Sequence, residues 1–293
     1  MLTRLRNTLA GLAAAALAAA LPHAALAAPA LWVIRDADST IYLYGSVHVL
    51  KPTTPWRTDK VAKALADSAD VTFEIDAVAD PAAAQPLIAQ LGLDPAHPLQ
   101  EKLSPADYQR LTAQAAAAGL PMQAVGMMRP WLAAVTMTLA PLQKAGYDPT
   151  SGVELKLAAE AKAAGKPVKG FETTEQQLHF MADLPEAEQI AMLRSNLDDA
   201  EKGAAELDSM VADWSAGDQA ALAHHFVDDM KAKYPVLYER LIAARNRAFA
   251  DDLVAKLAGK GVGFVAIGAG HFVGPDGIIA ELAKRGVKAE RIE

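Results

Sequence analysis

Two short segments, far apart in the chain, each place a histidine three residues after a glycine. They are Gly45-Ser46-Val47-His48 and Gly268-Ala269-Gly270-His271, and each follows an apolar run typical of a strand. Glycine lets a chain turn sharply, so each histidine should stand just past the carboxyl end of its strand, where sites collect in open α/β sheets. A single such histidine is more often structural, but two in the same context favour a shared functional site.

Carboxylates end two other strand-like runs. Glu74 follows Val71-Thr72-Phe73, with Asp76 beside it as a solvated partner, and Glu172 follows a run that ends at Phe171. If these strands are parallel to the first two, Glu74 and Glu172 reach the same edge of the sheet. Glu172 could equally be a helix-start carboxylate, which the helix macrodipole favours, and this interpretation is preferred for Glu175.

An arginine and an asparagine lie together inside a long predicted helix. Arg245 and Asn246 could belong to a surface salt-bridge patch, or could face the site and orient a carboxylate or a substrate oxygen. Two further histidines, His224 and His225, are adjacent, so they point to different faces of a helix and make a poor chelate.

The residue types limit the possible chemistry. The chain has no cysteine, which excludes a thiol nucleophile and a thiolate metal site. Histidines with carboxylates suit a divalent ion such as Mn²⁺, Zn²⁺, Fe²⁺ or Co²⁺, which would activate a water molecule for hydrolysis. The sequence signatures of zincins, serine hydrolases, P-loop proteins and dinucleotide-binding proteins are absent.

The elements that must position these residues cluster as strands at both ends of the chain. A β-hairpin is predicted from two runs rich in Val, Ile and Tyr, and helices fill the middle. The expected strands are Leu31–Arg35, Thr40–Tyr44, Val71–Asp76, Val168–Phe171, Gly263–Ile267 and Lys288–Ile292. The expected helices are Asp59–Ser68, Ser104–Ala118, Trp131–Ala145, Val153–Ala164, Pro185–Lys202, Ala204–Ser215 and Pro235–Lys256, with another opening at Gly274–Gly277.

This pattern predicts an α/β (α+β) fold. One mixed sheet is expected from about residues 28–80 and 260–293, with a largely helical insertion over about 81–259. No linker or low-complexity segment interrupts residues 28–293, so a single domain is expected there.

The first 27 residues have the pattern of a secretory signal peptide. Arg4 and Arg6 precede an alanine-rich apolar run, and Ala25-Leu26-Ala27 forms a cleavage site. The run is shorter than the ~20 residues that span a bilayer, so a periplasmic or secreted protein without stable membrane insertion is expected. Removal of Arg4 and Arg6 takes the net charge from −7 to −9, which disfavours nucleic acid as a partner.

The ordered set of motifs resembles the TraB/GumN family, which is similar to the TIKI group of metalloproteases. The resemblance extends over essentially all of residues 28–293. It rests on Leu31-Trp32, Gly45 to Leu50, Phe73-Glu74-Ile75-Asp76, Pro130-Trp131, Gly152-Val153-Glu154, Gly170-Phe171-Glu172-Thr173, Arg245-Asn246 and Gly268 to Gly274.

The resemblance implies a role for each motif residue. His48, Glu74 and His271 become the candidate metal ligands, with Mn²⁺ or Co²⁺ as the implied ion and Zn²⁺ or Fe²⁺ left open. Glu74, Glu172 and Arg245 become the candidate catalytic residues. Relatives usually have an aspartate where this chain has Glu154, so the role of that residue is left open.

Three functions follow from these residues. The first is an exported metal-dependent hydrolase, peptidase-like, acting on a peptide or small-molecule substrate. The second is a non-catalytic periplasmic protein that binds a metal, haem or peptide through the same histidines. The third is a structural role, with the histidines hydrogen-bonded in the core.

Overall fold

The computed structural model describes residues 28–79, 81–199 and 202–293. The predicted signal peptide lies outside these residues. The described strands form one six-stranded sheet in the order β4-β3-β5-β2-β1-β6. Their bounds are β1 Leu31–Arg35, β2 Ser39–Ser46, β3 Asp70–Ile75, β4 Val168–Glu172, β5 Gly261–Gly268 and β6 Glu290–Arg291. Each predicted strand is therefore present, and the last is shorter than expected.

The strand directions bring the candidate residues to one edge. β2, β5, β3 and β4 run parallel to one another, whereas β1 is antiparallel to both of its neighbours, β2 and β6. Ser46 pairs with Gly268, so the two Gly-x-x-His turns leave the sheet side by side. The mixed sheet, built from both ends of the chain with β4 added from the middle, confirms the predicted fold class.

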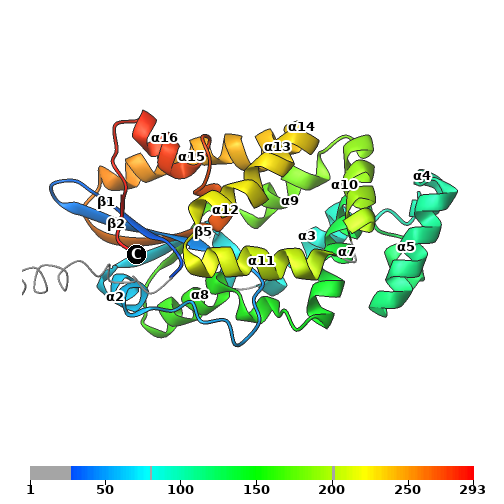
Figure 1. Cartoon of the computed structure of the whole chain (residues 1–293), viewed down its shortest axis with the longest axis horizontal. Helices are drawn as coiled ribbons and strands as arrows, with labels where there is room; N and C mark the ends of the chain where they lie inside the picture. Colours follow the sequence, from blue (N-terminus) through cyan, green and yellow to red (C-terminus); the bar gives the residue numbers. More distant parts are fainter. Residues whose placement is uncertain (1–27, 80, 200–201) are drawn as a thin grey trace, which may run out of the picture.

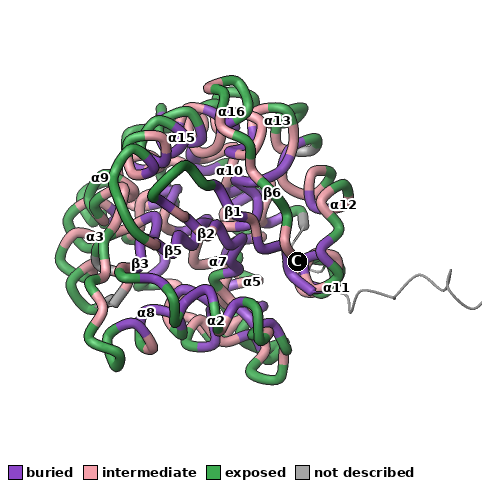
Figure 2. The backbone as a smooth tube through the Cα atoms, turned by 90° about the vertical axis from the view of Figure 1, so that its left-hand side faces the viewer, coloured by how far each residue is buried: buried purple, intermediate pink, exposed green. Residues whose placement is uncertain are grey.

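Helices cover both faces of the sheet (Figures 1 and 2). On one face α15 (Ala244–Leu257) and α16 (Ile278–Lys284) pack on alternate residues such as Leu43 and Val265. On the other face α2 (Asp59–Asp67) and α8 (Val153–Ala163) pack on Tyr44 and Phe264. The alternation follows from the two-residue repeat of a strand, and both faces are apolar because both are covered.

The middle of the chain forms a helical layer beyond the carboxyl edge of the sheet (Figure 1). Its own apolar cluster joins α5, α7 and α10. Ser104 caps α5 as predicted, since its hydroxyl accepts from the N–H of Asp107. The middle helices are α3 Gln85–Gly92, α4 Leu99–Lys102, α5 Pro105–Ala118, α6 Met122–Val125, α7 Pro130–Lys144, α9 Thr174–Ala182, α10 Glu186–Asp199, α11 Gly203–Ala216, α12 Gln219–Ala223, α13 Asp229–Lys233 and α14 Pro235–Tyr238.

The structure differs from the predicted helices in three respects. The expected continuous helix over 235–256 is instead α14, a π-helical segment η5 (Glu239–Ala243) and α15. A second π-helical segment, η4 (His224–Asp228), follows α12. The short helices α3, α4, α6, α12 and α13 were not predicted, because one or two turns carry too little periodicity to be recognised.

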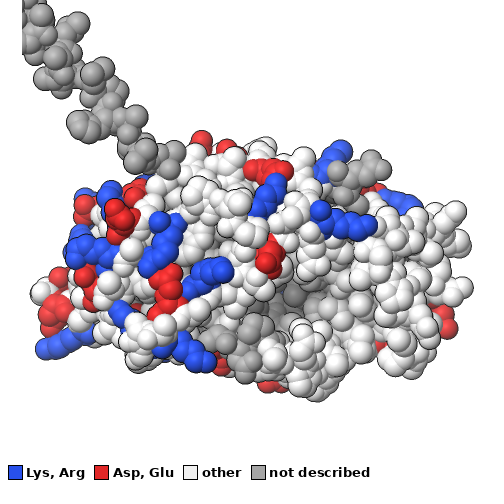
Figure 3. Space-filling model, turned by 90° about the horizontal axis from the view of Figure 1, so that it is seen from below, with Lys and Arg blue, Asp and Glu red and all other residues white. Residues whose placement is uncertain are grey.

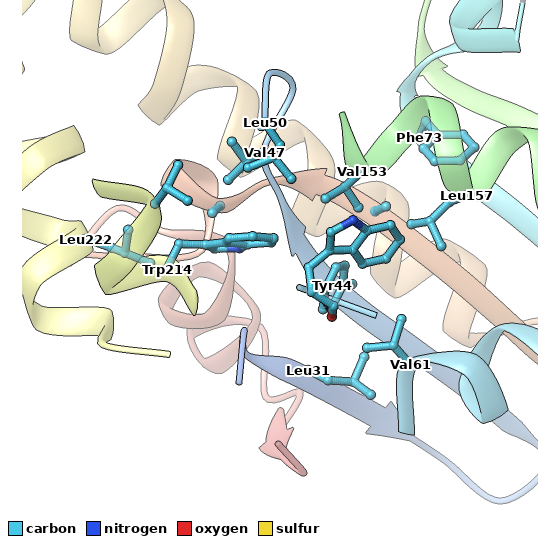
Figure 4. Close-up of a cluster of buried hydrophobic side chains, with 14 of the residues drawn as sticks. Leu31, Tyr44, Val47, Leu50, Val61, Phe73, Val153, Leu157, Trp214 and Leu222 are labelled. Carbon is cyan, nitrogen blue, oxygen red and sulfur yellow. Dashed lines mark hydrogen bonds between the residues drawn. The ribbon is translucent and has the colours of Figure 1, made fainter. Parts of the chain in front are cut away.

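The first Gly-x-x-His loop is anchored in the larger apolar cluster (Figure 4). Val47 and Leu50 are buried there, and the buried Trp214 of α11 donates its indole N–H to the carbonyl oxygen of Gly45 at 2.8 Å. His48, between the two anchors, is exposed. Packing thus fixes the loop backbone while leaving the imidazole accessible.

Charged side chains of both signs are interspersed on the face shown in Figure 3, without a broad patch of one sign. Among the helices of the described ranges, none is long and apolar enough to cross a membrane.

Candidate active site

His48 is held by a carboxylate. Its Nδ1 lies 2.7 Å from Oε1 of Glu154, and the hydroxyl of Ser46 donates to the same oxygen. The Glu154 carboxylate raises the pKa of His48 to about 9, although partial desolvation by the neighbouring groups opposes the shift. The His48 side chain is 65% exposed, and Nε2 makes no hydrogen bond with any residue that the structure describes. One ring nitrogen is thus oriented by Glu154, and the other is left for a further partner.

Gly152 explains how Glu154 reaches His48. A Cβ atom at residue 152 would lie only 2.1 Å from the backbone oxygen of His48, so only glycine permits this approach. The next N–H, of Val153, donates to the carbonyl oxygen of Val47 at 3.0 Å. The first turn of α8 therefore lies against the histidine loop, and its acidic residue faces the imidazole.

Glu74 ends β3 in a buried position. Its Oε1 accepts from the N–H of Gly268 at 2.6 Å, and its Oε2 accepts from Arg245 at 2.7 Å and from Gln177 at 3.2 Å. Burial alone would raise its pKa, but His271, His48, Arg245 and the Gly268 N–H together lower it to about 2. Glu74 is therefore an ionised carboxylate at neutral pH.

Arg245 uses all five of its N–H donors inside the protein. Nε and one NH2 donor bind the two oxygens of Glu172, each at 2.8 Å, and the other NH2 donor binds Glu74. The two NH1 donors reach the carbonyl oxygen of Leu241 at 3.0 Å and Nε2 of His271 at 3.2 Å. A guanidinium has five donors, so none is left for a substrate.

His271 is a buried, neutral imidazole with one defined tautomer. Its Nε2 accepts from Arg245, so Nδ1 carries the proton and donates to Oδ1 of Asn246 at 2.6 Å. The Asn246 amide nitrogen in turn donates to the carbonyl oxygen of Asp276 at 2.7 Å, which fixes the amide orientation. Burial lowers the pKa of His271 to about 4.

These side chains surround one point above Gly268. A Cβ atom built there would lie 3.1 Å from Oε1 of Glu74, 3.6 Å from Nε2 of His48 and 3.7 Å from Cδ2 of His271. The two Gly-x-x-His segments and Glu74 are therefore brought together. His48 is the accessible member, since the side chains of Glu74, Arg245 and Glu154 are at most 9% exposed.

The structure resolves the alternatives that the sequence left open. Glu172 belongs to the cluster through Arg245, whereas Glu175 lies in the first turn of α9. Thr173 caps that helix in a capping box with Gln176. Sequence analysis missed Ser46 and Gln177, which carry no signal besides their places in a predicted turn and helix.

His224 and His225 have partners outside this cluster. His225 pairs with Asp213 at 2.9 Å, and His224 lies 3.5 Å from Asp228. Both line a cavity of about 700 Å³ between α7, α10, α11 and the α12–α14 run. Their different partners agree with the expectation that they do not chelate one ion together.

As they lie, the predicted ligands do not fit a divalent ion. Both ring nitrogens of His271 are engaged, and both oxygens of Glu74 accept hydrogen bonds from the protein. Within the residues that the structure describes, no group of three or more His, Cys, Asp or Glu side chains is arranged to hold a metal ion. The guanidinium of Arg245 lies among Glu74, Glu172 and His271.

Comparison with known proteins agrees with the motif order. An uncharacterized protein of Treponema pallidum (strain Nichols) is 23% identical over 271 residues, which cover 87% of this chain and 80% of that protein. No solved structure matches the chain. The model of the TraB/PrgY/gumN family matches residues 30–291, which include every residue of the site, and the chain therefore belongs to the TraB/PrgY/gumN family.

Proposed function

We propose that this protein is a hydrolase, peptidase-like, whose active site is the cluster around Gly268. The carrying observation is the convergence of Nε2 of His48 and Oε1 of Glu74 on one point above Gly268. An accessible imidazole whose second nitrogen is held by a buried carboxylate is the usual arrangement of an acid–base group in acyl hydrolysis.

In the proposed reaction, His48 moves the proton. Its Nε2 takes a proton from a water molecule as the water oxygen bonds to the substrate carbonyl carbon. The same nitrogen then returns the proton to the leaving group as the acyl bond breaks. Glu154 keeps the imidazole oriented and stabilises its charged form, as expected for a carboxylate that supports a base.

The remaining residues orient and balance the charge. Glu74 is ionised and faces the same point as His48, so it can accept a hydrogen bond from the attacking water and orient it. Arg245 has no free donor, so it acts by holding Glu74 and Glu172 in place. Asn246 fixes the tautomer of His271.

Gly268→Val tests whether this point is the active site. The substitution places a side chain in contact with Glu74, His48 and His271 without changing a charge. We expect hydrolysis of a panel of peptide and ester substrates to fall about 100-fold, because displacement by about 1 Å misaligns a reacting group. Gly203→Ala is the matched control, since a Cβ atom there meets nothing within 4 Å. Equal activity of Gly268→Val and wild type would place the reaction elsewhere.

The pH dependence of hydrolysis should report the His48–Glu154 pair. As a general base His48 must be neutral, so kcat/KM should rise with pH and level off near its pKa of about 9. Glu154 is the largest cause of the raised pKa of His48. In Glu154→Gln, the pH at which kcat/KM levels off should therefore fall toward 6.5, the ordinary pKa of a histidine. If Glu154→Gln leaves this pH unchanged, the result would contradict the assignment of His48.

The divalent ion implied by the family resemblance remains a prediction, and no step proposed above passes through it. Because Arg245 pairs with Glu74 and His271, an ion bound by His48, Glu74 and His271 would require this arginine to withdraw. The alternative of a non-catalytic metal-, haem- or peptide-binding protein is tested by the same substrate panel. Binding without turnover would favour it.

Export is the second part of the proposal. The signal peptide pattern of residues 1–27 supports a periplasmic or secreted hydrolase with a peptide or small-molecule substrate. Mass spectrometry of protein expressed in a Gram-negative host should find the mature chain beginning near Ala28 in the periplasm. An uncleaved chain in the cytoplasm would overturn this part alone.

A further inference from the structure

We infer that the guanidinium of Arg245 is the permanent cation of this site, and that it occupies the position among Glu74, Glu172 and His271 that a divalent ion would otherwise take. The inference concerns the site of the proposed hydrolase and does not depend on its activity.

Every N–H donor of the Arg245 guanidinium is paired within the protein. Its five donors meet five acceptors, on Glu172, Glu74, His271 and the backbone oxygen of Leu241, at 2.7–3.2 Å. The contact with Glu172 is bidentate, which is the geometry that best fixes a guanidinium. Displacement of Arg245 by an ion would have to break all five of these hydrogen bonds.

Two aromatic rings also pack against the Arg245 guanidinium. The guanidinium carbon lies 5.3 Å from the ring centre of Phe180 on α9 and 5.2 Å from that of Phe249 on α15. Desolvated cation–π contacts add to the ion pairs, and Arg245 as a whole is 8% exposed. Helices α9 and α15 therefore provide aromatic side chains that stabilise a planar cation at this position.

Without Arg245, the site would hold two carboxylates and one imidazole and no cation. Glu74 and Glu172 are two carboxylates with side chains 9% and 13% exposed, and Nε2 of His271 is an imidazole acceptor beside them. Buried carboxylates need a cation, and two carboxylates with an imidazole are a donor set for a divalent ion. Arg245 thus neutralises Glu74 and pairs with His271, two of the three residues that the family resemblance implies as metal ligands.

The test compares metal binding by wild type, Arg245→Ala and the control Arg247→Gln. Arg247 follows two residues later and pairs with Glu239 at the surface. Each mature protein is treated with a chelator, dialysed and titrated with MnCl₂ or CoCl₂, while the thermal midpoint is recorded. Metal content is also measured on the wild type as purified.

We expect no shift for wild type and for Arg247→Gln. Arg245→Ala should gain roughly 5–10 °C at an ion concentration of about 100 times its Kd, because the ion binds only the folded state. Adding Glu74→Gln to Arg245→Ala should abolish the gain.

Two results would overturn the inference. The first is about one equivalent of a divalent ion in the purified wild type that is lost in Glu74→Gln. The second is a folded Arg245→Ala variant that binds neither ion. If Arg245→Ala does not fold, the metal content of the wild type decides. Substrate turnover is not measured in this test, so failure of the inference and failure of the proposed hydrolase are separate outcomes.

Discussion

Arg245→Met should lower the free energy of unfolding by about 3–5 kcal/mol, the cost of removing one partner from a buried ion pair. The methionine keeps much of the side-chain volume but leaves Glu74 and Glu172 without a cation in a site where they are almost inaccessible to water. Urea denaturation at neutral pH measures the change.

Two further variants separate charge from packing in this prediction. Arg245→Met combined with Glu74→Gln and Glu172→Gln should recover most of the lost stability, because no unpaired charge then remains. Arg247→Met removes an exposed ion pair and should change the free energy by less than about 1 kcal/mol. A loss of equal size in the triple variant would mean that packing on Phe180 and Phe249, not charge, holds Arg245.

His48→Asn should reduce kcat/KM for hydrolysis by about 10²–10⁴-fold, the usual contribution of a general acid–base group. The stability of the fold should change little, because the imidazole is 65% exposed and the loop is anchored by Val47 and Leu50. Kinetics with the best substrate of the panel, together with thermal midpoints, measure both quantities.

The matched control for this prediction is His224→Asn. His224 has a side chain that is 72% exposed and also lies beside a carboxylate, Asp228, but it is not among the side chains nearest to Gly268. Its replacement should leave kcat/KM unchanged within about twofold. If both variants retain full activity, His48 is not the proton carrier, and if both lose it equally, the loss is not specific to the site.

The positions of Glu74 and Glu172 show how much of the site the local sequence pattern predicts. Each follows an apolar run, and if the strands were parallel both would reach one edge, which the observed order β4-β3-β5-β2 confirms. Strand direction, however, depends on crossovers through helices that local patterns do not orient. The sequence therefore predicts that Glu74 and Glu172 end strands, but only the folded structure shows that these strands are parallel.

Glu154 shows where local pattern fails. Its place at the start of a helix was predictable, but its contact with His48 joins residues more than a hundred positions apart. That contact depends on the close approach of Gly152 to the His48 backbone, which no periodicity encodes. Gly152 was the one available signal, since a glycine before a helix start can mark a close approach.

The sequence by itself determined the two Gly-x-x-His turns, the strands that lead into them and the absence of thiol chemistry. Apolar periodicity and glycine placement are local properties, so a single chain suffices to read them. Tertiary structure alone decided which donors meet. It paired His48 with Glu154, and it placed the guanidinium of Arg245 against Glu74 and His271. The physical reason is that hydrogen-bond partners are set by packing across the whole domain, and spacing along the chain does not specify them.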